Sequence, residues 1–449
     1  MIHKYKLNNL NIVLDVNSGS VFCVDELVYN ILDDYEKEID FYKKYSDFSS
    51  ADVEEALEEI KYLKDNRVLF SELDYSKLMP KVDNRAPVIK ALCIHIAHDC
   101  NLKCKYCFAE EGEYHGSRSF MTFEVGKKAI DFLVENSSNR INLEIDFFGG
   151  EPLMNFDVVK SLVEYGRSIE KDKNKKFRFT LTTNGVLLND EIIEYANKHM
   201  HNVVLSLDGR KEINDNMRIT LNNKSSYDVI VPKFQHLANS RNQNNYYVRG
   251  TFTKNNLDFS KDVLHMADLG FKQISVEPVV APQDADYAIS KEDLSKIFTE
   301  YENLAFEMLK RKEENKEFNF FHFMIDLTGG PCAIKRMVGC GAGSEYLAVT
   351  PEGNLFPCHQ FVGDDEFKIG TVEDGIVNFT KRKDFENCNV YTKKECDNCW
   401  AKFYCSGGCA ANAYANHKDI LATYEVGCEM QKKRIECAIM LKCYEEGLA

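Results

Sequence analysis

Three cysteines stand close together in the first quarter of the chain, in a C-x3-C-x2-C pattern formed by Cys100, Cys104 and Cys107. A four-iron cluster has four irons to be ligated, so three thiolates leave one iron open for chemistry. Structural zinc is usually held by two separated pairs of ligands instead. Inert core cysteines are the alternative, but they seldom fall at this spacing beside a polar, lysine-rich loop. The pattern therefore indicates an iron–sulfur cluster with one open iron.

The last third of the chain carries a second set of regularly spaced cysteines. Two pairs, Cys396/Cys399 and Cys405/Cys409, could hold one zinc ion tetrahedrally. That alternative leaves three further cysteines of the pattern without a role. The complete set is Cys340, Cys358, Cys396, Cys399, Cys405, Cys409 and Cys428.

Length and composition favour a reduced, cytoplasmic protein. The 449 residues suffice for two or three domains with substantial cores. The 16 cysteines would suggest a disulfide scaffold in an oxidising compartment, but the chain starts without an apolar signal region and has no run of about eighteen apolar residues. The formal net charge of -15 argues against nucleic acid as a partner, because binding to phosphates depends on clustered Lys and Arg.

Residues 1–75 are predicted to form a separate small module. Short β-prone runs at 5–7, 11–16 and 20–24 are followed by apolar helical stripes at 27–32 and 53–63. Turn residues at 17–19 predict a hairpin, Ser49 and Ser50 are expected to cap the second helix, and a last strand is expected at 67–70. Residues 76–88, which include two prolines, are predicted to be a linker.

From residue 89 onward, β-prone and helix-prone segments alternate. Strands are expected at 92–97, 141–148, 177–182, 203–207, 247–253 and 273–277, and helices at 123–136, 157–171 and 191–199. Such alternation predicts parallel strands joined by crossover helices, an α/β architecture whose functional site lies at the carboxyl ends of the strands.

This alternation and the first cysteine motif together resemble the radical S-adenosylmethionine (SAM) superfamily and its partial (β/α)6 barrel, here expected at residues 89–320. In that family SAM chelates the open iron, and its reductive cleavage gives a 5'-deoxyadenosyl radical that abstracts hydrogen. The resemblance makes Cys100, Cys104 and Cys107 the catalytic cluster ligands. It assigns SAM contacts to Tyr106, Gly149, Gly150, Glu151, Asn184, Ser206, Asp208 and Arg218.

The expected SAM contacts differ in chemistry. Gly149–Gly150–Glu151 begins a match to the family's GGEP motif, in which glycines let the backbone approach a ligand and a carboxylate accepts from its ammonium group. The resemblance places Arg218 at the SAM carboxylate and Tyr106 beside the adenine. Asn184, Ser206 and Asp208 are implied near the ribose and methionine parts. Taken alone, each of these polar side chains is as readily explained as a loop or helix-cap residue whose hydrogen bonds are satisfied locally.

The second cysteine pattern resembles the SPASM domain, expected at residues 321–449, whose cysteines ligate two auxiliary four-iron clusters. Three [4Fe-4S] clusters and SAM are then the implied cofactors. Two closed auxiliary clusters need eight thiolates, and Cys332 is the candidate eighth; we favour the alternative, an open iron available to a substrate thiolate. The resemblance assigns Cys396, Cys399, Cys405 and Cys428 to one cluster and Cys340, Cys358 and Cys409 to the other.

The three parts together resemble the maturases of SCIFF (six-cysteines-in-forty-five) peptides, which belong with the thioether-forming sactisynthases. The amino-terminal module resembles their winged helix-turn-helix leader-recognition element, which binds its peptide by strand addition. The implied reaction joins a cysteine sulfur to a carbon of a cysteine-rich precursor peptide, with a cytosolic electron donor. A structural cap or a DNA-binding winged helix is the alternative for the module, and the acidic run at 33–38 disfavours DNA.

Two other functions compete with cross-linking. Anaerobic sulfatase maturases share the barrel and auxiliary clusters but oxidise a Cys or Ser to formylglycine, and they place an Asp after the cysteine equivalent to Cys358. Here the neighbour is His359, whose role as a replacement base competes with a structural role. A non-catalytic iron–sulfur peptide carrier is the third hypothesis. The Gly149–Gly150–Glu151 motif argues against it, because a carrier has no need of a SAM site.

Overall fold

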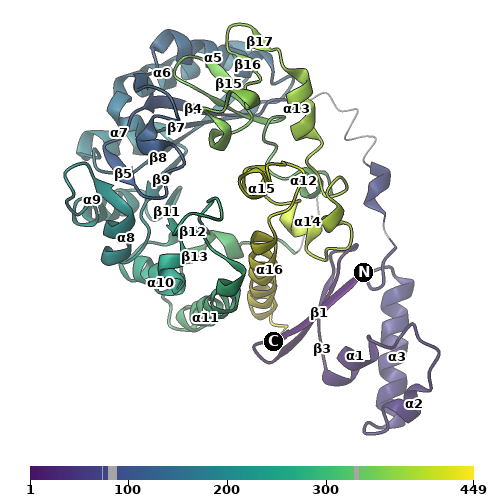
Figure 1. Cartoon of the computed structure of the whole chain (residues 1–449). Helices are drawn as coiled ribbons and strands as arrows, with labels where there is room; N and C mark the ends of the chain where they lie inside the picture. The colour runs from purple at the N-terminus through teal and green to yellow at the C-terminus, as the bar shows by residue number, and fades with distance from the viewer. Residues whose placement is uncertain (73, 79–87, 328–332, 449) are drawn as a thin grey trace.

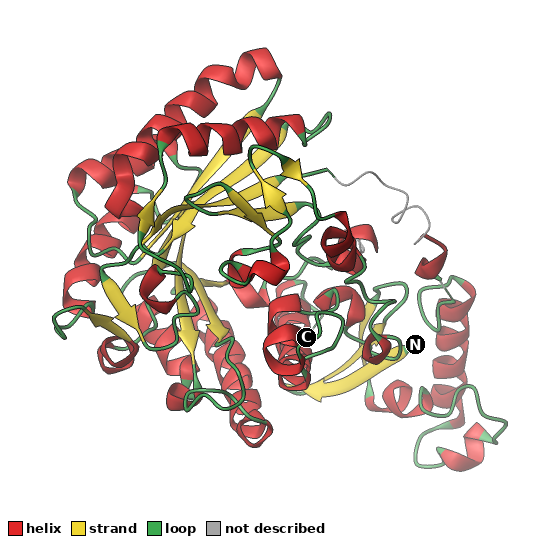
Figure 2. Cartoon of the chain, turned by 45° about the horizontal axis from the view of Figure 1, so that its top comes forward, coloured by secondary structure: helices red, strands yellow, loops and turns green. Residues whose placement is uncertain are grey.

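The computed structural model describes residues 1–72, 74–78, 88–327 and 333–448. A curved sheet lies at its centre, and helices cover the outer side of the sheet (Figure 1, Figure 2). The amino-terminal residues form a smaller sheet beside the carboxy-terminal helix (Figure 1). The candidate eighth auxiliary ligand, Cys332, and most of the expected linker lie outside the described residues.

Six parallel strands form the main part of the central sheet, which confirms the expected α/β architecture. In spatial order they are β4 (Ala91–His98), β7 (Asn142–Gly149), β8 (Lys176–Thr183), β9 (Asn202–Ser206), β11 (Tyr246–Phe252) and β12 (Gln273–Pro278). The outer helices are α5 (Phe123–Glu135), α6 (Phe156–Lys173), α7 (Asp190–His199), α9 (Tyr227–Ser240), α10 (Phe259–Asp268) and α11 (Leu294–Glu313).

Alternation along the strands separates the two faces of this sheet. In β8, Phe177, Phe179 and Leu181 are buried, whereas Lys176 and Arg178, which alternate with them, are exposed. Alternate residues of a strand point to opposite faces, so the apolar set packs under the outer helices and the polar set faces the concave side. The sequence therefore places polar side chains inside the curve of the sheet.

The sheet continues past the expected domain boundary at residue 321. Strand β14 (Tyr346–Val349) pairs in parallel with β4, and β13 (Asn319–Phe320) pairs with β12 at the opposite edge. Antiparallel strands β15 (Asn354–Phe356), β16 (Gly370–Thr371) and β17 (Gly375–Ile376) extend the β14 side. Residues expected in a separate carboxy-terminal domain thus build one end of the central sheet.

The amino-terminal sheet consists of antiparallel strands β1 (Ile2–Leu7), β2 (Leu10–Asp15) and β3 (Val21–Val24), with β3 at one edge. Helices α1 (Glu26–Ile31), α2 (Phe41–Lys44) and α3 (Ser50–Asp65) follow. Ser49 caps α3 as expected, because its hydroxyl accepts from the Asp52 amide at 3.1 Å. The strand expected at 67–70 is wrong: Arg67 and Phe70 have φ of 59° and 50°, which a strand does not allow.

This small sheet packs on both faces, so it is less separate than its sequence suggests. Val13 and Phe22 pack with α1 and α3, whereas Ile12 and Leu14, on the other face of the strands, join the main core with helix α16 (Glu425–Glu445). The Tyr5 hydroxyl donates to the Glu436 carbonyl on α16 at 2.8 Å. Helix α16 therefore lies between β1 of the small sheet and α11 of the barrel (Figure 1).

The remaining elements are short and mostly surround the concave side. They are β5 (Leu102–Cys104), β6 (Ser119–Phe120), α8 (Lys211–Met217), β10 (Arg218–Thr220), α12 (Ala333–Val338), α13 (Phe379–Glu386), α14 (Lys402–Cys405) and α15 (Ala410–His417).

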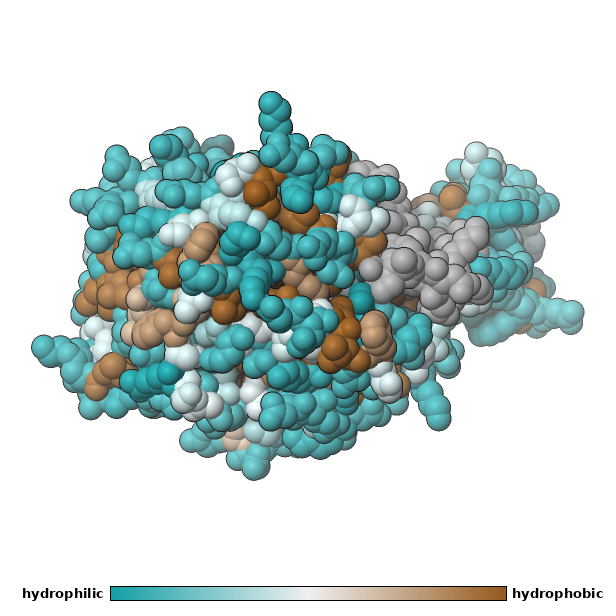
Figure 3. All heavy atoms as spheres, turned by 90° about the horizontal axis from the view of Figure 1, so that it is seen from above, coloured by the Kyte–Doolittle hydropathy of each residue, from teal (hydrophilic) through white to brown (hydrophobic). Residues whose placement is uncertain are grey.

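The face seen from above is mostly hydrophilic, with apolar side chains in separate patches (Figure 3). In the part of the chain that the structure describes, we find no helix with the length and apolarity needed to cross a bilayer.

Candidate active site

A cavity of about 200 Å³ lies at the carboxyl ends of the central strands. Nine of the eleven residues expected to bind the first cluster or SAM line it, and they come from the ends of β5, β7, β8, β9 and the start of β10. Sequence positions as distant as 100 and 218 therefore meet at one edge of the sheet. The nine are Cys100, Cys104, Tyr106, Cys107, Gly149, Gly150, Asn184, Ser206 and Arg218.

A short two-stranded ladder holds Cys104, and Cys100 and Cys107 lie before and after its first strand. Strand β5 pairs antiparallel with β10, so that Cys104 lies opposite Arg218. Burial raises the pKa of the Cys104 thiol to about 12, and burial also raises the pKa values of Cys100 and Cys107. Thiols in such surroundings become thiolates when a bound cation offsets the cost of desolvation. The donor set therefore fits iron, for which thiolates are the usual ligands.

The glycine pair after β7 is required by backbone packing. Gly149 has φ of 119°, and a Cβ there would lie 2.3 Å from the Ala97 carbonyl oxygen; at Gly150 it would lie 2.1 Å from that of Asp99. The Gly150 amide donates to Ala97 O at 2.8 Å. We expected the glycines to admit a ligand; they line the cavity, but their closest approach is to the backbone that leads into Cys100.

Glu151 is fully buried and is not among the residues that line the cavity, and its expected contact with a SAM ammonium group stays a prediction. Its buried carboxylate accepts from the Thr183 hydroxyl at 2.7 Å and from the amides of Asn184 and Leu153 at 2.8 and 3.1 Å. Burial raises its pKa to about 7. These hydrogen bonds join the ends of β7 and β8 and so place Asn184 at the cavity.

Asp208 is also buried and outside the lining, and it holds three residues that line the cavity. Its carboxylate accepts from the Tyr106 hydroxyl at 2.7 and 2.9 Å, from Arg218 at 3.0 Å and from the Thr251 amide at 2.9 Å. The Arg218 Nε is buried and has no hydrogen-bond partner among the described residues. A cationic donor left free beside a cavity fits an anionic group such as a carboxylate.

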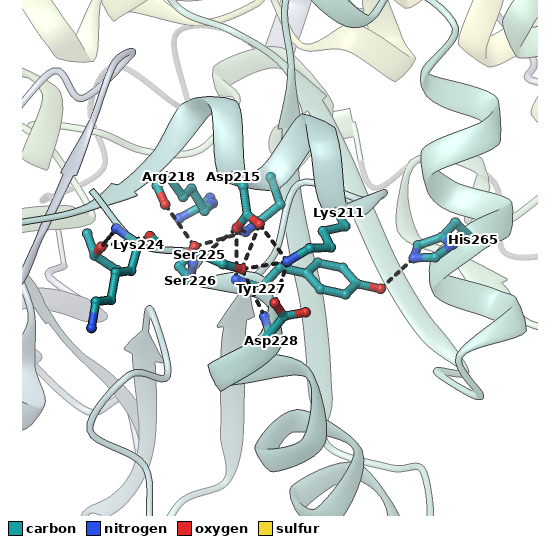
Figure 4. A network of polar contacts seen from close by, with 11 residues as sticks. Lys211, Asp215, Arg218, Lys224, Ser225, Ser226, Tyr227, Asp228 and His265 are labelled. Carbon is teal, nitrogen blue, oxygen red and sulfur yellow. Dashed lines mark hydrogen bonds and ion pairs between the residues drawn. The ribbon is translucent and has the colours of Figure 1, made fainter. Parts of the chain in front are cut away.

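A polar network outside the cavity fixes the segment that follows Arg218 (Figure 4). The Asp215 carboxylate of α8 accepts from the Ser226 and Tyr227 amides at 3.1 and 3.0 Å and from the Ser225 hydroxyl at 2.6 Å. The Ser226 hydroxyl donates to the Arg218 carbonyl at 2.8 Å. Sequence reasoning missed this network, because its partners are ten residues apart without a recognisable capping pattern.

The cavity extends to residues that sequence reasoning did not place there. Arg249 and Glu277, from β11 and β12, form an ion pair at 3.3 Å on its wall. His359 also lines it and contacts the Tyr346 hydroxyl through Nδ1 at 3.1 Å. Burial lowers the pKa of His359 to about 4, so the ring is neutral near pH 7. Arg249 and Glu277 were detectable as the inward-facing charges of two predicted strands.

The carboxy-terminal cysteines separate into two groups. Cys358 is buried, and repulsion from Cys409 and Cys340 adds to burial in raising its pKa. Within the described residues no group of three His, Cys, Asp or Glu side chains is arranged to hold a single metal ion. A second cavity, of about 260 Å³, is lined by four others: Cys396, Cys399, Cys405 and Cys428. The cluster that each group binds stays a prediction.

Comparisons with known proteins agree with this geometry. The profile of the 4Fe-4S single cluster domain family matches residues 90–231. The chain is 24% identical over 339 residues to a cysteine-type anaerobic sulfatase-maturating enzyme of Clostridium novyi (strain NT), covering 71% of this chain and 87% of the relative. It is 22% identical over 451 residues to the radical SAM cyclopropyl synthase TigE of Paramaledivibacter caminithermalis, covering 92% and 89%.

Two solved structures share the fold. Native anSMEcpe with bound AdoMet (SAM) has a TM-score of 0.66 at 20% identity and covers 80% of this chain and 100% of that one. Streptococcus suis SuiB bound to its precursor peptide SuiA has a TM-score of 0.52 at 17% identity and covers 92% and 95%. The chain therefore has the mixed α/β fold of these AdoMet-binding enzymes, and its sequence is similar to those of radical SAM enzymes.

Proposed function

We propose that this protein is a radical SAM maturase that installs a thioether between a cysteine sulfur and a carbon of a ribosomally made precursor peptide. The observation that carries the proposal is the cavity in which Cys100, Cys104 and Cys107 meet the free Nε of Arg218 at the strand ends. When bound there, a four-iron cluster with an open iron and SAM supply a 5'-deoxyadenosyl radical that abstracts hydrogen.

The residues of the cavity have distinct tasks in this proposal. Cys100, Cys104 and Cys107 would hold the cluster, and Arg218, whose Nε is buried without a partner among the described residues, would bind the carboxylate of SAM. Tyr106 lies against Asp208, which fixes its ring at the edge of the cavity. Asn184 and Ser206 complete the polar lining and suit the hydroxyl and amino groups of SAM.

The peptide would enter from the side of the carboxy-terminal segment. His359, Arg249 and Glu277 line that part of the cavity, and His359 directly follows Cys358. A neutral histidine and an ion pair offer donors and acceptors to a peptide backbone. An auxiliary cluster held by Cys340, Cys358 and Cys409 alone would keep one iron open to a substrate thiolate next to this wall.

The amino-terminal sheet is the proposed site for the leader of the peptide. Strand β3 is an edge strand, and a cavity of about 170 Å³ lies beside it, between β3 and α3. An extended peptide can add a strand to such an edge through main-chain hydrogen bonds and place side chains in the adjoining pocket. SuiB, whose fold this chain shares, has been solved bound to a precursor peptide.

Mass spectrometry tests the proposal. The cysteine-rich peptide encoded nearest the gene is incubated anaerobically with enzyme, SAM and reductant, and free thiols are then alkylated. Thioether formation predicts loss of two hydrogens and one fewer alkylated cysteine, and fragmentation locates the linked carbon. Retention of every alkylated cysteine while SAM is consumed would contradict it.

Formylglycine formation is the second candidate, because of the likeness to the sulfatase-maturating enzyme. It predicts conversion of one cysteine to an aldehyde, which a hydrazide reagent detects and which a thioether does not give. The side chain after Cys358 argues against it, since His359 is neutral and hydrogen-bonded to Tyr346 where that family is expected to carry a carboxylate.

A further inference from the structure

Three cysteines outside the cluster patterns gather where the amino-terminal sheet meets α16. Cys23 belongs to β3, and Cys437 and Cys443 belong to α16. All three are part of, or packed against, the main hydrophobic core. The Cys23 and Cys443 thiols contact each other, and this contact adds to burial in raising the pKa of Cys443.

The geometry of the two elements explains the contact. Tyr5, Ile12 and Cys23 are neighbours across the three strands, since Tyr5 pairs with Ile12 and Ile12 with Cys23. Two strand spacings separate Tyr5 from Cys23 by about 10 Å. Seven helical residues, from Glu436 to Cys443, cover about 10.5 Å and return to the same helix face. With Glu436 anchored over Tyr5, Cys443 reaches Cys23.

Cys437 is placed differently, although it is only six residues before Cys443. It follows Glu436 directly, so it lies about 100° around the helix from the face that meets the sheet. It is completely buried. The pairing of Cys23 is therefore selective for Cys443.

The two thiols of the pair differ in access. Cys23 is half-buried and lines the cavity beside β3, together with Leu448. Cys443 is 1% exposed and is not among the residues that line this cavity. Of the two thiols, only that of Cys23 lines the cavity, and Cys443 is the neighbouring thiol that can complete an exchange.

We propose that Cys23 and Cys443 are a redox-reactive pair that a low-molecular-weight disulfide converts to an intramolecular disulfide. The Cys23 thiolate attacks one sulfur of the reagent and releases the other as a thiol, and Cys443 then displaces the second thiol from Cys23. Two protein thiols thereby lose two electrons and two protons, and the reagent is reduced to two thiols.

The bond would connect the edge strand of the amino-terminal sheet to the carboxy-terminal helix. Noncovalent contacts such as that of Tyr5 with Glu436 now join these layers. A covalent link restricts separation of β3 from α16 and so lowers local opening of the strand. This inference is independent of SAM chemistry and of the peptide substrate.

The test treats the full-length, anaerobically purified protein with bis(2-hydroxyethyl) disulfide, then alkylates and digests it. We expect a peptide pair linked through Cys23 and Cys443, reversed by dithiothreitol, with slower hydrogen exchange at 21–24. Visible absorbance of the clusters is followed throughout, so that oxidised clusters are not mistaken for the thiol reaction. Persistence of the mixed disulfide on Cys23, or a link from Cys23 to Cys437, would overturn the proposal.

Two alanine variants on the same helix provide matched controls. Cys443→Ala should stop the reaction at the mixed disulfide on Cys23 and abolish the change in exchange. Cys437→Ala removes a buried thiol of equal size and should leave the Cys23–Cys443 link intact. Loss of the Cys23–Cys443 link in Cys437→Ala, or an intramolecular disulfide of Cys23 in Cys443→Ala, would contradict the assignment. The wild-type mapping needs neither variant to fold.

Discussion

At the scale of single residues, the cavity is organised by carboxylates that do not line it. Glu151 joins two strand ends, and Asp208 fixes Tyr106 and Arg218. Direct contact of either residue with SAM stays a prediction. Their hydrogen bonds make both of them positioning residues, whose loss changes the shape and charge of the cavity.

Asp208→Asn tests this role. The substitution keeps the volume but removes the charge that holds Arg218, and charged hydrogen bonds contribute about 1.5–3 kcal/mol. We expect SAM to bind about 10- to 100-fold more weakly by equilibrium dialysis, while the iron content is retained. Asp262→Asn is the matched control, since Asp262 is equally buried and paired with Arg210 outside the cavity. Equal SAM affinity in the two variants would contradict the role of Asp208.

At the scale of elements, the site depends on how loops are tied to the sheet. The segment after Arg218 is held in place by hydrogen bonds to the Asp215 carboxylate (Figure 4). Burial disfavours ionisation of Asp215, but the hydrogen bonds from Ser225 and Tyr227 outweigh it, so the pKa of Asp215 is lowered. The stabilisation that Asp215 contributes is therefore fully present at pH values above the pKa that this carboxyl has in the unfolded chain. It is lost as the pH falls through the pKa of Asp215 in the folded protein.

Asp215→Asn should accordingly lower the Tm at neutral pH, and the difference from the wild type should shrink as the pH falls below about 4. Thermal unfolding at a series of pH values measures this. Asp228→Asn is the control: Asp228 also pairs with Lys211, but its side chain is 65% exposed and a surface pair contributes little. A Tm difference between Asp215→Asn and the wild type that stays constant down to a pH of about 3 would contradict the role of the ionised Asp215 carboxylate.

The elements themselves were largely predictable. Period-two alternation in β7 and β8 and apolar stripes in α5 and α6 are local signals, so the parallel strands and their helices followed from the sequence. Pairing of β14 with β4 was not predictable, because it joins residues about 255 apart. The strand predicted at 67–70 rested on β-prone side chains. The backbone is left-handed at both ends of this segment, so no strand forms there.

The sequence predicted which residues meet at the site better than it predicted how their side chains are oriented. The spacing of Cys100, Cys104 and Cys107 identified residues that do meet in one cavity. Orientation was out of reach, because it depends on partners from other strands, such as Thr183 for Glu151 and Thr251 for Asp208. Such partners have no fixed sequence distance from the residues they hold.

At the scale of the whole molecule, α16 connects regions that the sequence suggested were separate. It carries Cys428 of the second cysteine cavity, packs against α11, and forms one covering layer of the amino-terminal sheet. His3 of that sheet stacks on Trp400, the neighbour of Cys399, with ring centroids 3.7 Å apart. The amino-terminal sheet is therefore built into the molecule next to a cysteine cavity.

Ile12→Ala tests this connection. Ile12 is fully buried on the face toward α16, and the truncation leaves a cavity that costs about 2–5 kcal/mol. We expect faster hydrogen exchange in 425–445. Val13→Ala is the matched control, because Val13 is equally buried but faces α1 and α3. If the amides of α16 exchange at the wild-type rate in Ile12→Ala, packing of the amino-terminal sheet does not stabilise α16, and the prediction is contradicted.

The most direct test of the central claim is release of 5'-deoxyadenosine from SAM by the anaerobic, iron-reconstituted and reduced protein. The cavity formed by Cys100, Cys104, Cys107 and Arg218 predicts release by the wild type and none by Cys104→Ala, which removes one cluster ligand. Wild-type protein that holds its iron and binds SAM but releases no 5'-deoxyadenosine would contradict radical SAM chemistry at this site.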